Sequence, residues 1–154
     1  HTYAFHPLSA AAIPAAIGEL KKLMASGLPQ RVSVHLKKRL YELADKHICV
    51  GDVRGIGHFW GLELVKNRKT KEPFDTKADK FGTKALMTGR VAGDAMQRGV
   101  YISPWYDTLV IAPPLIITEA QVDEALAVVD QSLEIADRES IDTGTPAAHS
   151  TEYQ

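Results

Sequence analysis

The sequence predicts an α+β fold in which helices pack on one face of a small, mainly antiparallel sheet. Apolar residues recur at helical spacing near the start of the chain and again after residue 118. Between these regions lie short runs of β-branched and aromatic residues whose alternation is typical of half-buried strands. No internal repeat is visible, and the elements follow the order helix, helix, strand, strand, helix, strand, strand, helix, which indicates an α+β layer.

Length and composition set the class of protein. The 154 residues are 45% hydrophobic and 24% charged, as in an ordinary soluble domain with its own core. A net charge of −1 gives no field that attracts polyanions, so no nucleic-acid partner is expected. No apolar stretch approaches the ~20 residues that span a bilayer, and a cytoplasmic location is the default expectation. Cys49 has no second thiol and is expected to be a buried, inert thiol of a reducing compartment.

Two helices are predicted in the first third of the chain. The first runs from Ser9 to Met24 and is ended by Gly27. Pro14 lies in or just past its first turn, so this helix starts late or kinks there. The second begins after Pro29 and ends near His47. Each has one apolar stripe, formed by Ile13, Ile17, Leu20 and Met24 in the first and by Val32, Leu36, Leu40 and Leu43 in the second. The simplest arrangement is an antiparallel pair joined around residues 27–29.

A hairpin is predicted next. Residues 48–50 and 58–65 have the composition of strands, and the second places Trp60, Leu62 and Leu64 on one face. The glycine-containing segment 51–57 is predicted to be the bulged or turned connection between them. This segment lacks the Lys-Ser/Thr of a phosphate-binding P-loop and leads into a strand where that motif requires a helix.

The second half of the chain repeats this alternation. A polar loop over 66–74 includes a basic run, 66–71, that is expected to be solvated. Asp75 or Thr76 is predicted to cap a third helix that reaches about Arg98, and its three glycines (Gly82, Gly89 and Gly93) favour close packing against another backbone.

Strands are predicted over 100–102 and 109–112. A capping box, 118–121, begins the last helix, whose apolar face comprises Val122, Ala125, Leu126, Val129 and Leu133. From residue 138 the chain is polar and is expected to be disordered or loosely attached.

Few residues carry an obvious chemical role. The six histidines are scattered without the spacing of a metal site, and no paired carboxylates or activated nucleophile are visible. Arg54 is a candidate cation on a rigid turn, with an exposed or structurally paired arginine as the alternative. Thr2 precedes a helix-entry segment, where its hydroxyl can hold a phosphate or simply cap the helix. The aromatic loop 103–106 either lines a pocket or covers the core. If the protein is an enzyme, some of its catalytic residues lie outside this chain.

Three sequence blocks carry a family resemblance. They are residues 1–11 (HTYAFHPLSAA), 53–65 (VRGIGHFWGLELV) and 112–118 (APPLIIT). In this order and spacing they resemble the C-terminal part of a class III (omega-type) pyridoxal-phosphate aminotransferase, over residues 1 to about 137. The resemblance implies the small C-terminal domain of a fold-type I transferase over 28–137, preceded by the end of the large domain and a linking helix over 1–27 and followed by a polar tail over 138–154.

The resemblance also implies an activity. A transaminase of this type moves an amino group from an amine or ω-amino acid to a keto acid such as pyruvate, with pyridoxal 5′-phosphate as cofactor, and works as a homodimer or higher homo-oligomer. Its Schiff-base lysine, the aspartate below the pyridine nitrogen and the stacking aromatic residue are implied to lie upstream of His1 in an N-terminal large domain. No catalytic residue is therefore expected in this chain, which should be inactive alone and should expose its first helix.

Individual residues follow from the same resemblance. Thr2 is implied to contact the cofactor phosphate of the neighbouring subunit, and His1 to contact it through its backbone. Phe5 departs from the family pattern, which usually has Gly there. Ser103 stands where some amine–pyruvate members have a mobile arginine for the substrate carboxylate, so this role is not expected here. Ser103, Trp105 and Arg54 remain the substrate candidates.

Two other classes of protein fit the chain without that resemblance. One is a free-standing α+β module that binds or senses a small ligand at its sheet. The other is an oligomerisation domain whose contact faces are the alanine-rich first helix and the glycine-bearing third helix.

Overall fold

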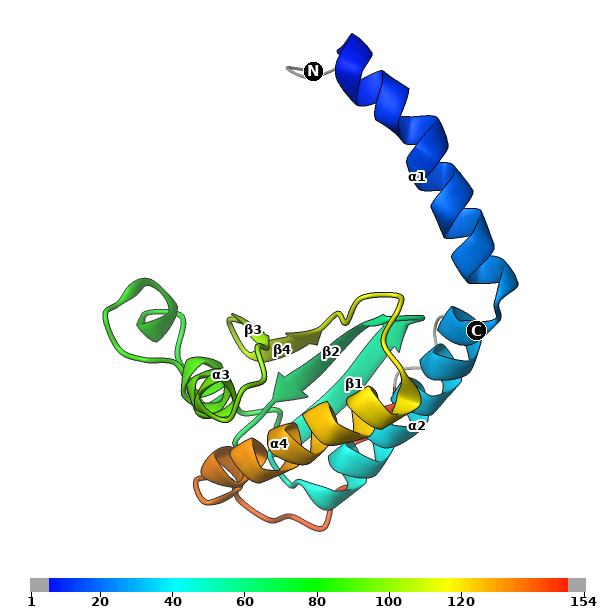
Figure 1. Cartoon of the computed structure of the whole chain (residues 1–154). Coiled ribbons are helices and arrows are strands. Elements are labelled where there is room, and N and C mark those ends of the chain that lie inside the picture. Colours follow the sequence, from blue (N-terminus) through cyan, green and yellow to red (C-terminus); the bar gives the residue numbers. More distant parts are fainter. Residues whose placement is uncertain (1–5, 150–154) are drawn as a thin grey trace.

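The computed structural model describes residues 6–149, which form four α-helices, one 3₁₀ turn and five strands (Figure 1). The helices are α1 (Pro7–Ala25), α2 (Leu28–Lys46), α3 (Met87–Gln97) and α4 (Glu119–Asp137), and the 3₁₀ turn is η1 (Asp79–Phe81). The strands are β1 (Val50–Ile56), β2 (Phe59–Leu64), β3 (Ser103–Trp105), β4 (Thr108–Ile111) and β5 (Ala148–His149). The predicted α+β class and order of elements are confirmed, and β5 is an addition.

The strands form one sheet in the order β3-β4-β2-β1-β5. All neighbouring pairs are antiparallel except β1 and β5. The helices α2, α3 and α4 lie on one side of the sheet (Figure 1). In the part of the chain that the structure describes, no helix covers the opposite side, which we call the open face.

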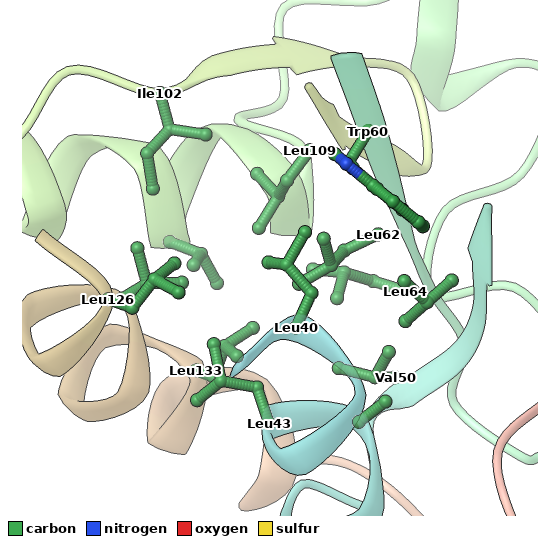
Figure 2. Packing of buried hydrophobic residues seen from close by; sticks show 14 of the residues in the cluster. Leu40, Leu43, Val50, Trp60, Leu62, Leu64, Ile102, Leu109, Leu126 and Leu133 are labelled. Atoms are coloured by element: carbon green, nitrogen blue, oxygen red, sulfur yellow. The ribbon is translucent and has the colours of Figure 1, made fainter. Parts of the chain in front are cut away.

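The core lies between the sheet and the helices. Trp60, Leu62 and Leu64 point from β2 toward the helices and are buried, as their alternation predicts. Figure 2 shows these side chains in one buried cluster with leucines of α2 and α4, among them Leu40 and Leu133. All four stripe residues of α2 are buried, and those of α4 are buried except for the half-buried Ala125.

Helix α1 differs from its prediction in two ways. It projects away from the remaining elements and buries no residue (Figure 1), so the expected antiparallel pair with α2 is wrong. The reason is that α2 turns its apolar stripe toward the sheet and α4 and offers α1 no second apolar face. The helix also starts early, at Pro7, because proline fits the first helical position, and Pro14 is accommodated inside it.

The first hairpin is tighter than predicted. Most of segment 51–57 belongs to β1, and only Gly57, with φ +59°, and His58 form the turn. The predicted bulge is present, as a register shift between Val50 and Asp52. Glycine is required at position 55 because the backbone of β2 lies very close to it, and not because of the turn. A Cβ at this position would lie 2.3 Å from the carbonyl oxygen of Phe59.

The predicted start of the third helix is wrong, because α3 begins at Met87. A local hydrogen bond from the Thr76 amide to the Asp79 carboxylate, 2.8 Å long, closes a separate turn instead. Asp75 still caps the helix, from twelve residues upstream, since its Oδ2 accepts a 2.8 Å bond from the Met87 amide. The expected close packing at Gly89 and Gly93 is absent, because a Cβ at either position would meet nothing within 4 Å among residues 6–149.

The second hairpin is shifted toward the C-terminus. Residues 100–102 are not a strand, because the Val100 amide donates to Ala95 at the end of α3 and Ile102 packs into the core. Strand β3 instead occupies the segment predicted to be an aromatic loop. Pro104 is tolerated there because β3 is an edge strand.

The C-terminal segment also differs from its prediction. The capping box at Thr118 and Gln121 is confirmed. The expected loose tail is wrong for residues 138–149, because the Ile141 amide donates to Lys66 and β5 pairs with β1. The His149 ring stacks on Tyr41 with 4.2 Å between the ring centroids. Backbone pairing at a sheet edge needs no apolar periodicity, so the sequence carried no signal for it.

Candidate functional site

The two predicted cofactor-binding residues, His1 and Thr2, lie outside the described residues, as does Phe5. The structure therefore places the three substrate candidates and the side chains around them. Among residues 6–149 there is no group of three or more histidine, cysteine or acidic side chains that could hold a metal ion. No helix in that range is long and apolar enough to cross a bilayer.

Arg54 lies on strand β1 and not on a turn. Its Nη1 atom is 2.6 Å from Oδ2 of Asp52 and 2.6 Å from Oε2 of Glu63. These hydrogen bonds raise the pKa of the guanidinium group. The two carboxylates neutralise the cation, so the paired alternative for Arg54 is confirmed and a substrate carboxylate would have to compete with both.

Ser103 and Trp105 share the open face of the sheet with Arg54. Residues opposite each other on paired strands point to the same face. The pairs Ser103–Val110, Val110–Gly61 and Gly61–Arg54 form one row across β3, β4, β2 and β1. Because three strand spacings separate the row's ends, Ser103 lies roughly 14 Å from Arg54. The structure thus brings the candidates onto one surface without bringing them into contact.

A shallow hollow of about 330 Å³ lies on the open face. Its walls include Arg54, Ile56, Phe59, Thr108 and Val110. Ile56 and Phe59 are each more than 60% exposed. Sequence reasoning missed this surface, although the apolar residues on the outward positions of both strands could have indicated a second apolar face.

One arginine of the basic run is buried and not solvated as predicted. Arg68 is 6% exposed, and its guanidinium donates hydrogen bonds to four backbone carbonyl groups. The acceptors and donor–acceptor distances are Val50 at 2.8 Å, Thr145 at 3.2 Å, Ala44 at 2.5 Å, and His47. Burial lowers the pKa of Arg68. Because Ala44 and His47 are at the end of α2, the cation also neutralises the negative end of that helix.

A second buried charge cluster joins α2 to α4. The ring nitrogens of His47 lie 2.6 Å from Oδ2 of Asp137 and 2.8 Å from Oδ1 of Asp130. Burial alone lowers the pKa of His47, but the hydrogen bonds and charges of the two carboxylates outweigh it and the pKa is raised. Lys46 also pairs with Asp130, at 2.6 Å. This histidine therefore holds structure together at a distance from the open face.

Cys49 lies beside this cluster as the predicted buried thiol. Its side chain is fully buried and its backbone amide donates to Oδ1 of Asp137 at 2.9 Å. Burial raises the pKa of the Cys49 thiol, which keeps it protonated and unreactive at neutral pH.

Comparison with known proteins gives a consistent result. A family model described as Aminotransferase class-III matches residues 1–133. The putrescine–pyruvate aminotransferase of Pseudomonas aeruginosa is 33% identical over 138 residues, covering 86% of this chain and 27% of that protein. A solved transaminase from directed evolution by ancestral reconstruction has a TM-score of 0.75 at 35% identity, covering 90% of this chain and 29% of that one. A PMP-bound aminotransferase from Vibrio fluvialis has a TM-score of 0.65 at 30% identity, covering 77% and 25%. The chain thus spans less than a third of these relatives.

Proposed function

Because the chain belongs to the class III aminotransferases, we propose that it is the C-terminal part of a pyridoxal-phosphate-dependent transaminase. The enzyme would move an amino group from an amine or ω-amino acid to a keto acid such as pyruvate. The observation that carries this proposal is the match of the family model over residues 1–133. The similarity to a putrescine–pyruvate aminotransferase supports the amine and keto-acid classes. A cytoplasmic location is part of the same proposal.

The chain's own residues fit only one part of a cofactor site. Pyridoxal phosphate, when bound, supplies an electron sink for the carbon that carries the substrate amine. The chain spans less than a third of its relatives and matches their C-terminal part. In line with the family resemblance, we assign the lysine that holds this cofactor covalently to the large domain, and assign only phosphate contacts, by Thr2 and by the His1 backbone, to this chain.

The proposed domain arrangement explains two uncovered apolar surfaces. Residues 1–27 would end the large domain and form the linking helix, residues 28–137 the small domain, and residues 138–154 a C-terminal segment. In α1, the apolar stripe of Ile13, Ile17, Leu20 and Met24 is between 42% and 55% exposed. An uncovered stripe of this size marks an interaction surface. The N-terminal large domain and the second subunit of a homodimer are the proposed partners for α1 and for the open face.

The decisive experiment compares this chain with the full-length protein that contains it. With pyridoxal phosphate, the full-length protein should show a visible absorption band that borohydride removes, and should convert an amine and pyruvate into a carbonyl product and alanine. The 154-residue chain should do neither, because it lacks the covalent lysine. A borohydride-sensitive band on the chain alone would contradict the missing lysine. A full-length protein without transamination would favour a ligand-binding or oligomerisation module.

A substitution at Thr2 tests the phosphate contact. In the full-length protein, Thr2→Ala should weaken cofactor binding by about 10- to 100-fold, because it removes a hydrogen bond to a charged group worth about 1.5–3 kcal/mol. Thr2→Ser keeps the hydroxyl and is the matched control. Equilibrium dialysis of pyridoxal phosphate measures the effect. Equal dissociation constants for the wild type, Thr2→Ala and Thr2→Ser would contradict a contact between Thr2 and the cofactor phosphate.

A further inference from the structure

Strand β1 has a sequence that is complementary to itself. It reads VGDVRGI over residues 50–56. When two copies of this strand lie antiparallel about a two-fold axis at Val53, Asp52 of each copy faces Arg54 of the other. In the same arrangement, Gly51 of each copy faces Gly55 of the other. Opposite charges and matched small residues across two strands favour their pairing, so β1 fits a second copy of itself.

The backbone of β1 is also oriented for this pairing. The hairpin between β1 and β2 has a two-residue loop, flanked by the paired residues Ile56 and Phe59. Residues that flank such a loop exchange hydrogen bonds with each other, and the direction of the backbone groups alternates along a strand. The amide and carbonyl groups of Val53 and Gly55 therefore point away from β2. Two Val53 residues that exchange hydrogen bonds bring the side chains of the neighbouring pairs close together.

The charged side chains of β1 are placed to change partners. Arg54 is exposed and bonds to Asp52 and Glu63 through one nitrogen, Nη1, at 2.6 Å each. A guanidinium group has five N–H donors on three nitrogens, so further donors of Arg54 remain for another carboxylate. Two antiparallel copies exchange their Asp52 partners, and each guanidinium keeps its bond to Glu63.

A C-terminal segment covers this edge of β1 within one chain. We call residues 138–149 the strap. In the part of the chain that the structure describes, the strap pairs with β1 at Asp52 and Val53, two of the seven residues of that strand. The tip of the strap is held by the ring of His149, which stacks on Tyr41 with 4.2 Å between the centroids. The strap thus covers the centre of the self-complementary sequence through a short pairing.

We infer that the strap is a removable cover of an interaction surface, and that the partner of this surface is a second copy of the chain. While the strap is in place, it blocks the two-fold pairing at its centre. When the strap opens, two β1 strands pair antiparallel and join two sheets into one. Covering an edge strand with a loop is a known protection against such pairing. The inference does not depend on the proposed transaminase function, because it involves no cofactor and no substrate.

Sedimentation equilibrium of the 154-residue chain measures the dissociation constant of its self-association. Ala148→Gly/His149→Gly opens the strap, because it removes the stacked ring and gives the unpaired backbone more freedom. It should strengthen self-association by about 10- to 100-fold. Ala148→Val/His149→Phe is the matched control, because valine and phenylalanine favour strands and phenylalanine keeps a ring on Tyr41. This control should associate no more tightly than the wild type.

Charge variants identify the surface that the opened strap exposes. In the double-glycine background, Asp52→Arg places like charges opposite each other twice and should return self-association to the wild-type level. Asp52→Arg/Arg54→Asp restores opposite charges and should associate within about threefold of the opened chain. Helix α1 is unchanged in all these proteins, so any association through its exposed stripe contributes equally to each.

A milder variant keeps the test decisive if the double-glycine chain does not fold. His149→Ala removes the stacked ring alone and should strengthen self-association by about threefold. Opened variants that associate no more tightly than the wild type overturn the strap as a cover. An association that Asp52→Arg does not weaken, or that the exchanged pair does not restore, overturns β1 as the surface on which two copies meet.

Discussion

Arg68→Met is expected to lower the free energy of unfolding by about 3–5 kcal/mol. The methionine keeps most of the apolar stem but removes the charged donor from four backbone carbonyl groups, two of them at the end of α2. Buried acceptors that lose their donor keep the full cost of their desolvation. Because these carbonyls belong to α2, β1 and the segment before β5, three parts of the fold are loosened at once.

Urea denaturation of the chain measures this effect. Trp60 is 3% exposed in the core, so its fluorescence reports unfolding, and a Trp105→Phe background removes the second tryptophan. Lys69→Met, at the exposed neighbouring position, is the matched control and should change stability by less than about 0.5 kcal/mol. Equal midpoints for both methionine variants would show that the Arg68 hydrogen bonds contribute no net stability.

The second large effect is a dependence of stability on pH that originates at His47. Its pKa is higher in the folded state than the ordinary value of 6.5, so its contribution is fully present below about pH 6.5 and is lost as pH rises through the folded pKa. Asp130 and Asp137 have lowered pKa values, and their contributions are lost only as pH falls below about 3.8. The ion cluster should thus stabilise the fold most between about pH 4 and pH 6.5.

His47→Gln should remove the decline in stability above pH 6.5 that the cluster causes. It should also cost about 3 kcal/mol at pH 5.5, because it leaves the two carboxylates without their shared cation. The charged groups around His47 are Lys46, which remains on Asp130, and Arg68, which bonds to the His47 carbonyl. Urea titrations at intervals from pH 5 to 9 give the slope. His6→Gln removes the exposed histidine that precedes α1 and should leave that slope unchanged, whereas an unchanged slope in His47→Gln would assign the pH dependence to other groups.

Elements that depend on contacts between residues close together in the sequence could be predicted from it. The stripe that begins at Val32 and the capping box at Thr118 depend on residues three or four positions apart, and both are confirmed. Contacts between residues far apart in the sequence could not be predicted in this way. Asp75 is predicted to cap the third helix from the position just before it, but it caps that helix from twelve residues away, and β5 pairs with a strand formed almost one hundred residues earlier. Neither contact leaves a periodic pattern, so propensity and spacing contain no information about it.

The same distinction applies to the candidate site. Loop composition and the family resemblance predicted Arg54, Ser103 and Trp105 as substrate candidates, and the strand register places these three side chains on one face. Neither type nor spacing could show that Asp52 and Glu63 neutralise Arg54, because Glu63 faces it only through the pairing of β1 with β2. The sequence wrongly predicts a solvent-exposed Arg68 for a related reason, since the carbonyl groups that accept its hydrogen bonds converge only in the folded chain.

The position of β5 at the edge of the sheet has a consequence for biosynthesis. Strand β1 is translated well before the segment that pairs with its outer edge, which ends at His149. Chains fold as they emerge from the ribosome, and unpaired strand edges are templates for aggregation. During translation of the roughly ninety residues between these strands, the β1 edge has no partner from its own sheet. A nascent chain stalled before residue 148 should therefore depend on chaperones more strongly than the finished one.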